Sequence, residues 1–226
     1  MIRLLGIFGL VCCLSAYAND KTTDADNHLP NVLILGDSIS IGYTSHVKMM
    51  LKGKANIFRP MAKNGKKPEN CAGTTHGVQR IDEWLKGRKY AVIHFNWGLH
   101  DLKHINPTTK KNSNKMSDPR QAEPEVYKKQ LAETVKTLKA TGAKLIFATT
   151  TPYPDGVQPA RLPADAKAYN DIALKVMKEH EVKVNDLYGF VLPKLNELQI
   201  PKTVHFKGNG SKALAEKVAE AIKKHL

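Results

Sequence analysis

Short, nearly continuous apolar runs recur along the chain, and each is typical of a strand buried on both faces of a sheet. Longer stretches follow them in which apolar residues return every three or four positions, as on one face of a helix. This alternation, which shows no internal repeat, predicts an open parallel sheet covered by helices on both sides. The predicted strands are 32–35, 55–58, 90–95, 144–151 and 182–186.

The predicted helices keep their apolar residues on one face, and three of them are followed by a glycine. Gly53, Gly87 and Gly142 stand where a helix C-terminus often takes a left-handed residue. Residues 103–124 are polar, rich in lysine and contain three prolines, which predicts a long loop rather than a packed element. The helices are expected within 43–51, 78–85, 131–138, 169–177 and 214–222.

The first 18 residues have the pattern of a secretory signal peptide. Arg3 precedes an apolar run, and residues 16–18 read Ala-Tyr-Ala, which matches a cleavage site. The chain is therefore expected to be exported, to the periplasm or out of the cell. The residues before the two cysteines at 12 and 13 lack the small side chains of a lipid-attachment site. No later stretch has the length of a transmembrane helix.

Removal of the signal peptide leaves 208 residues, enough for one domain with a sizeable core. Residues 19–30 are polar and aperiodic, which predicts a flexible lead-in before a single domain at 31–226. Cys71 is then the only cysteine, so an intramolecular disulfide is excluded. Stability must come from the core.

The chain is basic, with a formal net charge of +14 that becomes +13 without Arg3. A basic exported protein attracts anionic partners such as acidic polysaccharides or lipid headgroups. Most lysines are dispersed along helical stretches, where a solvated face accounts for them. No nucleic-acid-binding motif is present, and no basic cluster is interleaved with aromatic residues, so nucleic acid is not an expected partner.

A candidate nucleophile follows the first predicted strand. Gly36 permits a sharp turn after it, and Ser38 then stands where the next helix begins. Backbone N–H groups and the positive helix end at such a place favour a serine whose attack creates an oxyanion. Because Ser38 could equally be an ordinary helix cap, the interpretation depends on whether the chain supplies a base.

Two further candidates, a single histidine and a cluster of two histidines with an aspartate, are expected at the carboxyl edge of the sheet, where ligands of such folds bind. His205 lies in an irregular segment before the last helix, which would return it to the edge that carries Ser38. His100, Asp101 and His104 have the spacing of a metal site, but the nearby prolines disfavour the regular helix that this spacing needs. We therefore expect no metal ion.

Four motifs together resemble the sequence blocks of the SGNH (GDSL) hydrolases in order and approximate spacing. They are Gly36-Asp37-Ser38, Gly73 in Asn-Cys-Ala-Gly, Gly98-Leu99-His100-Asp101, and Val204-His205-Phe206. The resemblance spans nearly the whole chain after the signal peptide.

The resemblance implies a flavodoxin-like three-layer α/β/α sandwich with about five parallel strands. It also implies ester hydrolysis through an acyl-serine intermediate, without a cofactor, with Ser38 as nucleophile and His205 as base. The backbone N–H groups of Ser38 and Gly73 would share the oxyanion hole with a side chain of the third motif.

Two positions depart from the family pattern. The third motif usually has asparagine where this chain has His100; a histidine can still donate to an oxyanion, and Asn96 is a substitute donor. The last motif usually has aspartate three residues before the histidine, where this chain has Lys202. His205 would then be oriented by a backbone carbonyl, or by an acid from elsewhere such as Asp101 or Glu197; a Ser-His dyad is the working hypothesis.

Removal of a small acyl group, most simply acetyl, from a carbohydrate fits export, a polar loop near the site and a basic surface. A lipid-directed esterase of the lysophospholipase or thioesterase type is the main alternative, because the same family contains such enzymes. A third interpretation is a catalytically weak relative that binds an anionic glycan, since His100 and Lys202 replace expected residues.

Overall fold

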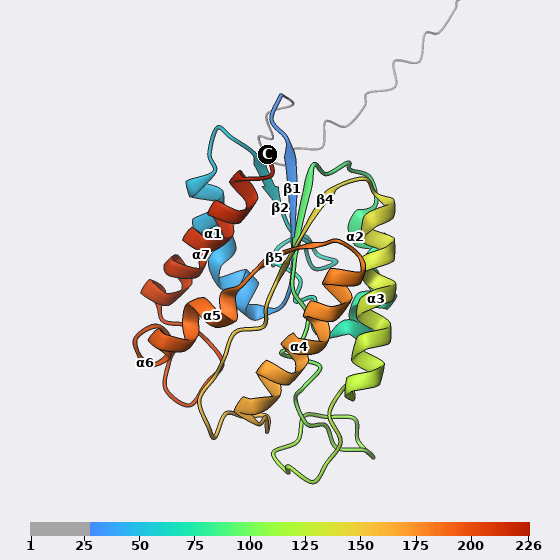
Figure 1. Cartoon of the computed structure of the whole chain (residues 1–226), viewed down its shortest axis with the longest axis vertical. Coiled ribbons are helices and arrows are strands. Elements are labelled where there is room, and N and C mark those ends of the chain that lie inside the picture. Colours follow the sequence, from blue (N-terminus) through green and yellow to red (C-terminus); the bar gives the residue numbers. More distant parts are fainter. Residues whose placement is uncertain (1–27) are drawn as a thin grey trace, which may run out of the picture.

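The computed structural model describes residues 28–226 and forms a five-stranded parallel sheet between two layers of helices (Figure 1). The strand order is β2-β1-β3-β4-β5, the flavodoxin-like order that the resemblance implied. The strands are β1 (Asn31–Leu35), β2 (Asn56–Phe58), β3 (Val92–Phe95), β4 (Lys144–Ala148) and β5 (Lys183–Asn185).

The helices of the two layers bury different sets of apolar residues. Helices α2 (Thr74–Leu85), α3 (Pro124–Ala140) and α4 (Pro163–Glu179) cover one face of the sheet. The other face is covered by α1 (Ser38–Met50) and α7 (Gly208–Lys223), with the short α5 (Leu187–Val191), η1 (Leu192–Lys194) and α6 (Leu195–Leu198) beside them. The predicted three-layer α/β/α architecture is therefore confirmed.

The central strands are buried on both faces of the sheet, as their nearly continuous apolar runs predict. Every residue of β3 is buried, and in β1 only Asn31 is not. The edge strand β5 is short and leaves Lys183 and Val184 exposed. Prolines open α3 and α4, where a missing N–H costs no helical hydrogen bond.

Two sequence expectations need adjustment. The fourth strand ends at Ala148, so residues 149–151 leave the sheet at its carboxyl edge instead of extending it. The loop at 103–124 is held by antiparallel bridges that join His104 to Arg120 and Ile105 to Asn112. The expected signal peptide and most of the lead-in lie outside the described residues. Among residues 28–226, no helix is both long and apolar enough to cross a membrane.

Candidate active site

Ser38 is the first residue of α1, and two residues, Gly36 and Asp37, separate it from β1. Asp37 caps the helix: its buried carboxylate accepts a hydrogen bond from the Ile39 N–H at 2.9 Å. A Cβ on Gly36 would lie 3.0 Å from Ser40 Oγ, so the tight turn tolerates little more than glycine. Asp37 thus caps the helix, which leaves the hydroxyl of Ser38 available for another partner.

That partner is His205. Ser38 Oγ lies 3.0 Å from His205 Nε2, although the two residues are 167 positions apart in sequence. The loop holding His205 is fixed by its own backbone: the Ile200 N–H donates to the His205 carbonyl, and the His205 N–H donates to Thr203 Oγ1. The nucleophile and base expected from the sequence are therefore within hydrogen-bond reach.

Neither acid proposed from the sequence orients His205. Asp101 Oδ1 accepts hydrogen bonds from the Thr74 N–H at 2.7 Å and the Thr74 hydroxyl at 2.6 Å, so it caps α2. Glu197 is exposed on α6. Within residues 28–226, no carboxylate hydrogen-bonds to His205, while Lys202 is exposed in the turn before it. The site is a Ser-His pair without a carboxylate partner.

The second motif lies at the start of α2, where Gly73 is the N-cap. A Cβ at Gly73 would lie 2.7 Å from Gln121 Nε2 and 2.8 Å from Asp101 Oδ1, so this close approach requires glycine. The Cys71 N–H donates to the Gly36 carbonyl at 3.2 Å, which ties this segment to the turn before Ser38. The Gly73 N–H has no acceptor among the described residues, as an oxyanion donor requires.

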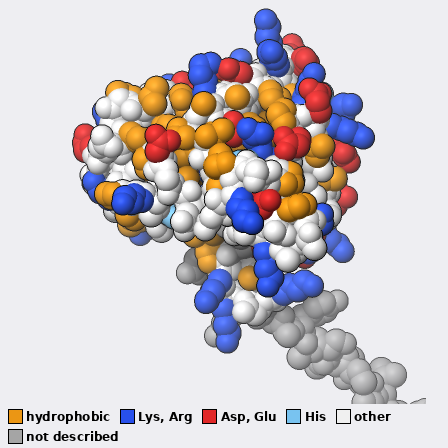
Figure 2. Space-filling model, turned by 90° about the horizontal axis from the view of Figure 1, so that it is seen from below, with side chains coloured by type: hydrophobic (Ala, Val, Ile, Leu, Met, Phe, Trp, Pro, Cys, Tyr) orange, Lys and Arg blue, Asp and Glu red, His pale blue; other side chains and the backbone are white. Residues whose placement is uncertain are grey.

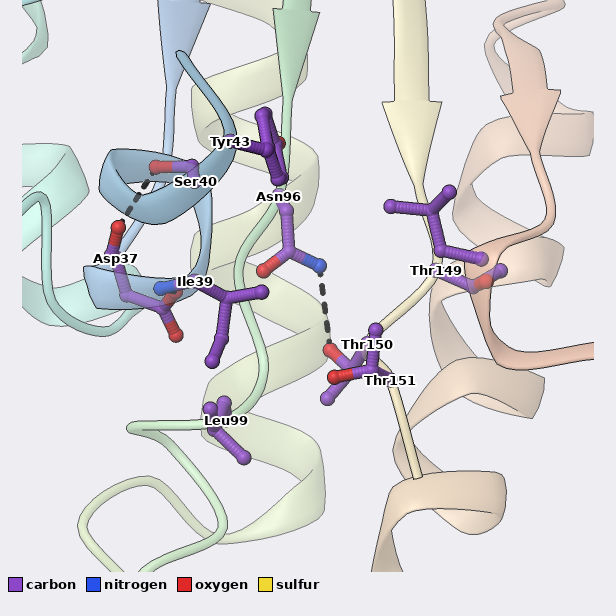
Figure 3. Close-up of a pocket in the computed structure, with 10 residues that line it drawn as sticks. Asp37, Ile39, Ser40, Tyr43, Asn96, Leu99, Thr149, Thr150 and Thr151 are labelled. Carbon is purple, nitrogen blue, oxygen red and sulfur yellow. Dashed lines mark hydrogen bonds between the residues drawn. The ribbon is translucent and has the colours of Figure 1, made fainter. Parts of the chain in front are cut away.

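Asn96 is turned away from the role of oxyanion donor. Its Nδ2 donates to the Ala148 carbonyl at 2.7 Å and to Thr150 Oγ1 at 3.3 Å. Figure 3 shows the amide pointing across a small pocket toward Thr150, beyond the end of β4. Asn96 therefore connects the ends of β3 and β4, and the substitute role expected from the sequence is wrong for this geometry.

His100 remains as the side-chain donor of the third motif. Burial, together with the positive charges of Lys103 and Arg161, lowers the pKa of His100 to about 3. Lys103 Nζ lies 3.5 Å from His100 Nδ1, and because an ammonium group can only donate, this contact favours the tautomer in which Nδ1 accepts. The proton of the neutral ring then sits on Nε2. This arrangement gives His100 one N–H donor at neutral pH.

The metal interpretation finds no support in the side-chain positions. His104 is buried with Nδ1 against the Asp118 carbonyl, a backbone contact inside the 103–124 loop. Across the described part of the chain, no group of three His, Cys, Asp or Glu side chains is placed to hold an ion.

Arg59 is a site residue that the sequence analysis missed. It follows β2 and donates to Ser40 Oγ, Thr44 Oγ1 and the carbonyl oxygens of Gly36 and Glu69. These hydrogen bonds hold the turn before Ser38 and the first turns of α1 in place. A single arginine after a strand carries no sequence signal of such a role.

Asp101 gives the fold a predicted pH dependence. Burial raises its pKa to about 6 from an ordinary value of 3.8, despite the hydrogen bonds from Thr74. Between these values the folded state holds the proton more tightly than the unfolded state. The contribution of Asp101 to the free energy of unfolding therefore falls by about 2–3 kcal/mol as the pH rises through this window.

Urea unfolding at several pH values between about 4 and 7 measures this contribution. The variant Asp101→Asn cannot titrate, so its stability should fall less with rising pH than that of the wild type. Curves of equal slope for the two proteins would show that Asp101 does not titrate in this window.

The sequence matches no protein-family model and no curated protein, but solved structures share the architecture. An acetyl xylan esterase is 15% identical, with a TM-score of 0.66 over 85% of this chain and 99% of the other. A lipase/acylhydrolase from Enterococcus faecalis is 18% identical, with a TM-score of 0.69 over 87% and 96%. A GDSL-like lipase from Bacteroides thetaiotaomicron is 16% identical, with a TM-score of 0.64 over 87% and 89%.

The chain has the SGNH hydrolase fold. These likenesses span nearly the whole of each compared chain, so the sheet and both helical layers are shared. Within the SGNH fold, Ser38 and His205 come from opposite ends of the chain and meet at the carboxyl edge of the sheet. The backbone N–H groups and side chains around this pair decide which reaction the site can support.

Proposed function

We propose that the protein is an exported serine esterase that removes small acyl groups, most simply acetyl, from a carbohydrate. The observation that carries the proposal is the 3.0 Å contact between Ser38 Oγ and His205 Nε2 at the start of a helix. Nucleophile and base in such contact are the minimum for acyl transfer through serine.

The mechanism uses these groups in two steps. His205 Nε2 accepts the Ser38 proton as Oγ attacks the ester carbonyl, and the oxyanion is held by the Ser38 and Gly73 N–H groups and His100 Nε2–H. The intermediate collapses, the bond to the alcohol breaks, and the proton passes from His205 to the leaving oxygen. Water then attacks the acyl-serine with His205 as base, which releases the carboxylic acid and restores Ser38.

The pair without an acid is consistent with a slower enzyme rather than with a different reaction. The aspartate of a triad fixes the histidine tautomer, and its replacement costs about 10⁴-fold in the serine protease case. Here the backbone bonds around Ile200, Thr203 and His205 hold the loop in place, although no side chain of the described residues sets the tautomer.

Acetyl removal from a carbohydrate is supported by the likeness to an acetyl xylan esterase. Export follows from the pattern of residues 1–18 and is part of the proposal. The likeness to a lipase/acylhydrolase keeps lipid esters as the alternative substrate class.

Acetate release from acetylated oligosaccharides, compared with turnover of long-chain p-nitrophenyl esters, tests the assignment. We expect the purified protein to release acetate and to turn over the acetyl ester at least tenfold faster than a ten-carbon acyl ester. Preference for the long chain would assign the protein to the lipid-directed class. Binding of glycan without turnover of any ester would assign it to the catalytically weak class.

A further inference from the structure

Two cations contact the third motif, Arg161 at Leu99 and Lys103 at His100. Arg161 is buried, and its Nε donates to the Leu99 carbonyl while Nη1 donates to the Pro159 carbonyl, both at 3.0 Å. Lys103 is half-buried and contacts His100 Nδ1. Both positive charges act on His100 strongly enough to lower its pKa. The two cations therefore stand beside the proposed reaction centre.

Neither cation has a carboxylate partner. In the part of the chain that the structure describes, no Asp or Glu forms an ion pair with Arg161 or Lys103. By contrast, Arg120 is bound by both carboxylate oxygens of Asp165, at 2.8 and 3.0 Å. A buried guanidinium without a counter-charge is costly, and an anionic ligand would supply that counter-charge.

The remaining hydrogen-bonding capacity of Arg161 points the same way. Its Nη2 makes no hydrogen bond to any described residue, and the protein does not fully enclose this atom. Arg59, a half-buried arginine behind the turn that precedes Ser38, donates through both Nη atoms to four acceptors. Both Nη atoms of Arg59 are thus occupied by protein acceptors and only its enclosed Nε is unpartnered, whereas Nη2 of Arg161 is a donor left for a ligand.

Two carboxylates act on these cations at longer range. Asp37 acts on Arg161, but its Oδ1 already accepts from the Ile39 N–H. Asp101 acts on Lys103, but its Oδ1 is committed to Thr74. On the face shown in Figure 2, Lys and Arg side chains stand mostly at the margins, with several Asp and Glu side chains among them. A positive field therefore persists beside His100.

We propose that Arg161 and Lys103 form a subsite for a carboxylate on the sugar that carries the ester, so that the substrate is an acetylated acidic glycan. The inference rests on the proposed function and names its substrate class. A carboxylate is the planar anion that a guanidinium fork matches best, and Lys103 adds a second positive charge at the same motif.

A pair of substrates that differ only in charge tests the subsite. Acetylated oligogalacturonide carries free carboxylates, and the same oligomer with its carboxylates methyl-esterified does not. We expect kcat/KM for acetate release to be at least tenfold higher on the acidic oligomer. Lys103→Gln and Arg161→Gln should bring that ratio close to one, while the exposed Lys175→Gln, at the far end of α4, should leave it unchanged.

Binding to an inactive protein separates this inference from the proposed function. With Ser38→Ala, the acidic oligomer should bind at least tenfold more tightly than its methyl ester by calorimetry, and Lys103→Gln should remove the difference. If Arg161→Gln does not fold, Lys103→Gln decides the result alone. Equal binding and equal rates on both oligomers would overturn the subsite, whereas failure to hydrolyse any ester would overturn the function only.

Discussion

Ser38→Ala is expected to lower kcat for acetate release by about 10⁴-fold or more, because no other group can form the acyl intermediate. His205→Ala should have an effect of similar size, since without the base the hydroxyl at 3.0 Å keeps its proton. The double variant should lose little more than either single variant, because the two residues act as one unit. Steady-state kinetics with an acetyl ester measures all three.

Matched controls lie on the same helix. Ser45 is exposed on α1, and His46 is half-buried there without a hydrogen bond among the described residues. Ser45→Ala and His46→Ala should therefore retain nearly full activity. Retention of a tenth or more of the wild-type rate by Ser38→Ala would rule Ser38 out as the nucleophile.

His100→Ala is expected to lower kcat by about 10²–10³-fold with little change in KM, the loss typical of one oxyanion donor. The donor acts only when charge develops on the carbonyl oxygen, so substrate binding should be largely spared. His100→Asn, which restores the residue usual in the family, should recover most of the rate. Initial rates over a range of ester concentrations separate kcat from KM.

The pH profile provides a second readout for His100. Because the pKa of His100 is lowered to about 3, the ring stays neutral throughout the working range. Replacing it with Asn, which does not titrate, should therefore leave the shape of the kcat profile between about pH 5 and pH 9 unchanged. A His100→Ala variant with an unchanged kcat, or an acid limb that disappears in His100→Asn, would refute the assigned role.

The fold and the Ser-His pair follow from local sequence signals. Apolar runs fix which segments become buried strands, and parallel strands bring all their carboxyl ends to one edge of the sheet. Residues that follow β1 and precede α7 must then approach each other. Topology thus places Ser38 and His205 at one edge although 167 positions separate them, and the resemblance to the SGNH motifs supplied their pairing as nucleophile and base.

The rest of the site depends on side-chain directions that periodicity does not determine. Asn96 directly follows β3, which pairs with β4, and its amide donates to the Ala148 carbonyl at the end of β4 instead of pointing into the oxyanion hole. Asp101 follows His100 directly, yet its carboxylate caps α2 through Thr74. Arg59 and Arg161 are recognisable only by the carbonyl groups that converge on them.

Covalent labelling with a fluorophosphonate examines the nucleophile and its base together. The reagent forms a stable bond with a serine whose hydroxyl is activated by a base, and peptide mass spectrometry locates the adduct. The wild-type protein should be labelled on Ser38 alone, His205→Ala should react at least a hundredfold more slowly, and Ser38→Ala should not react. An adduct on another serine, or equal labelling rates for wild type and His205→Ala, would contradict catalysis by the Ser38–His205 pair.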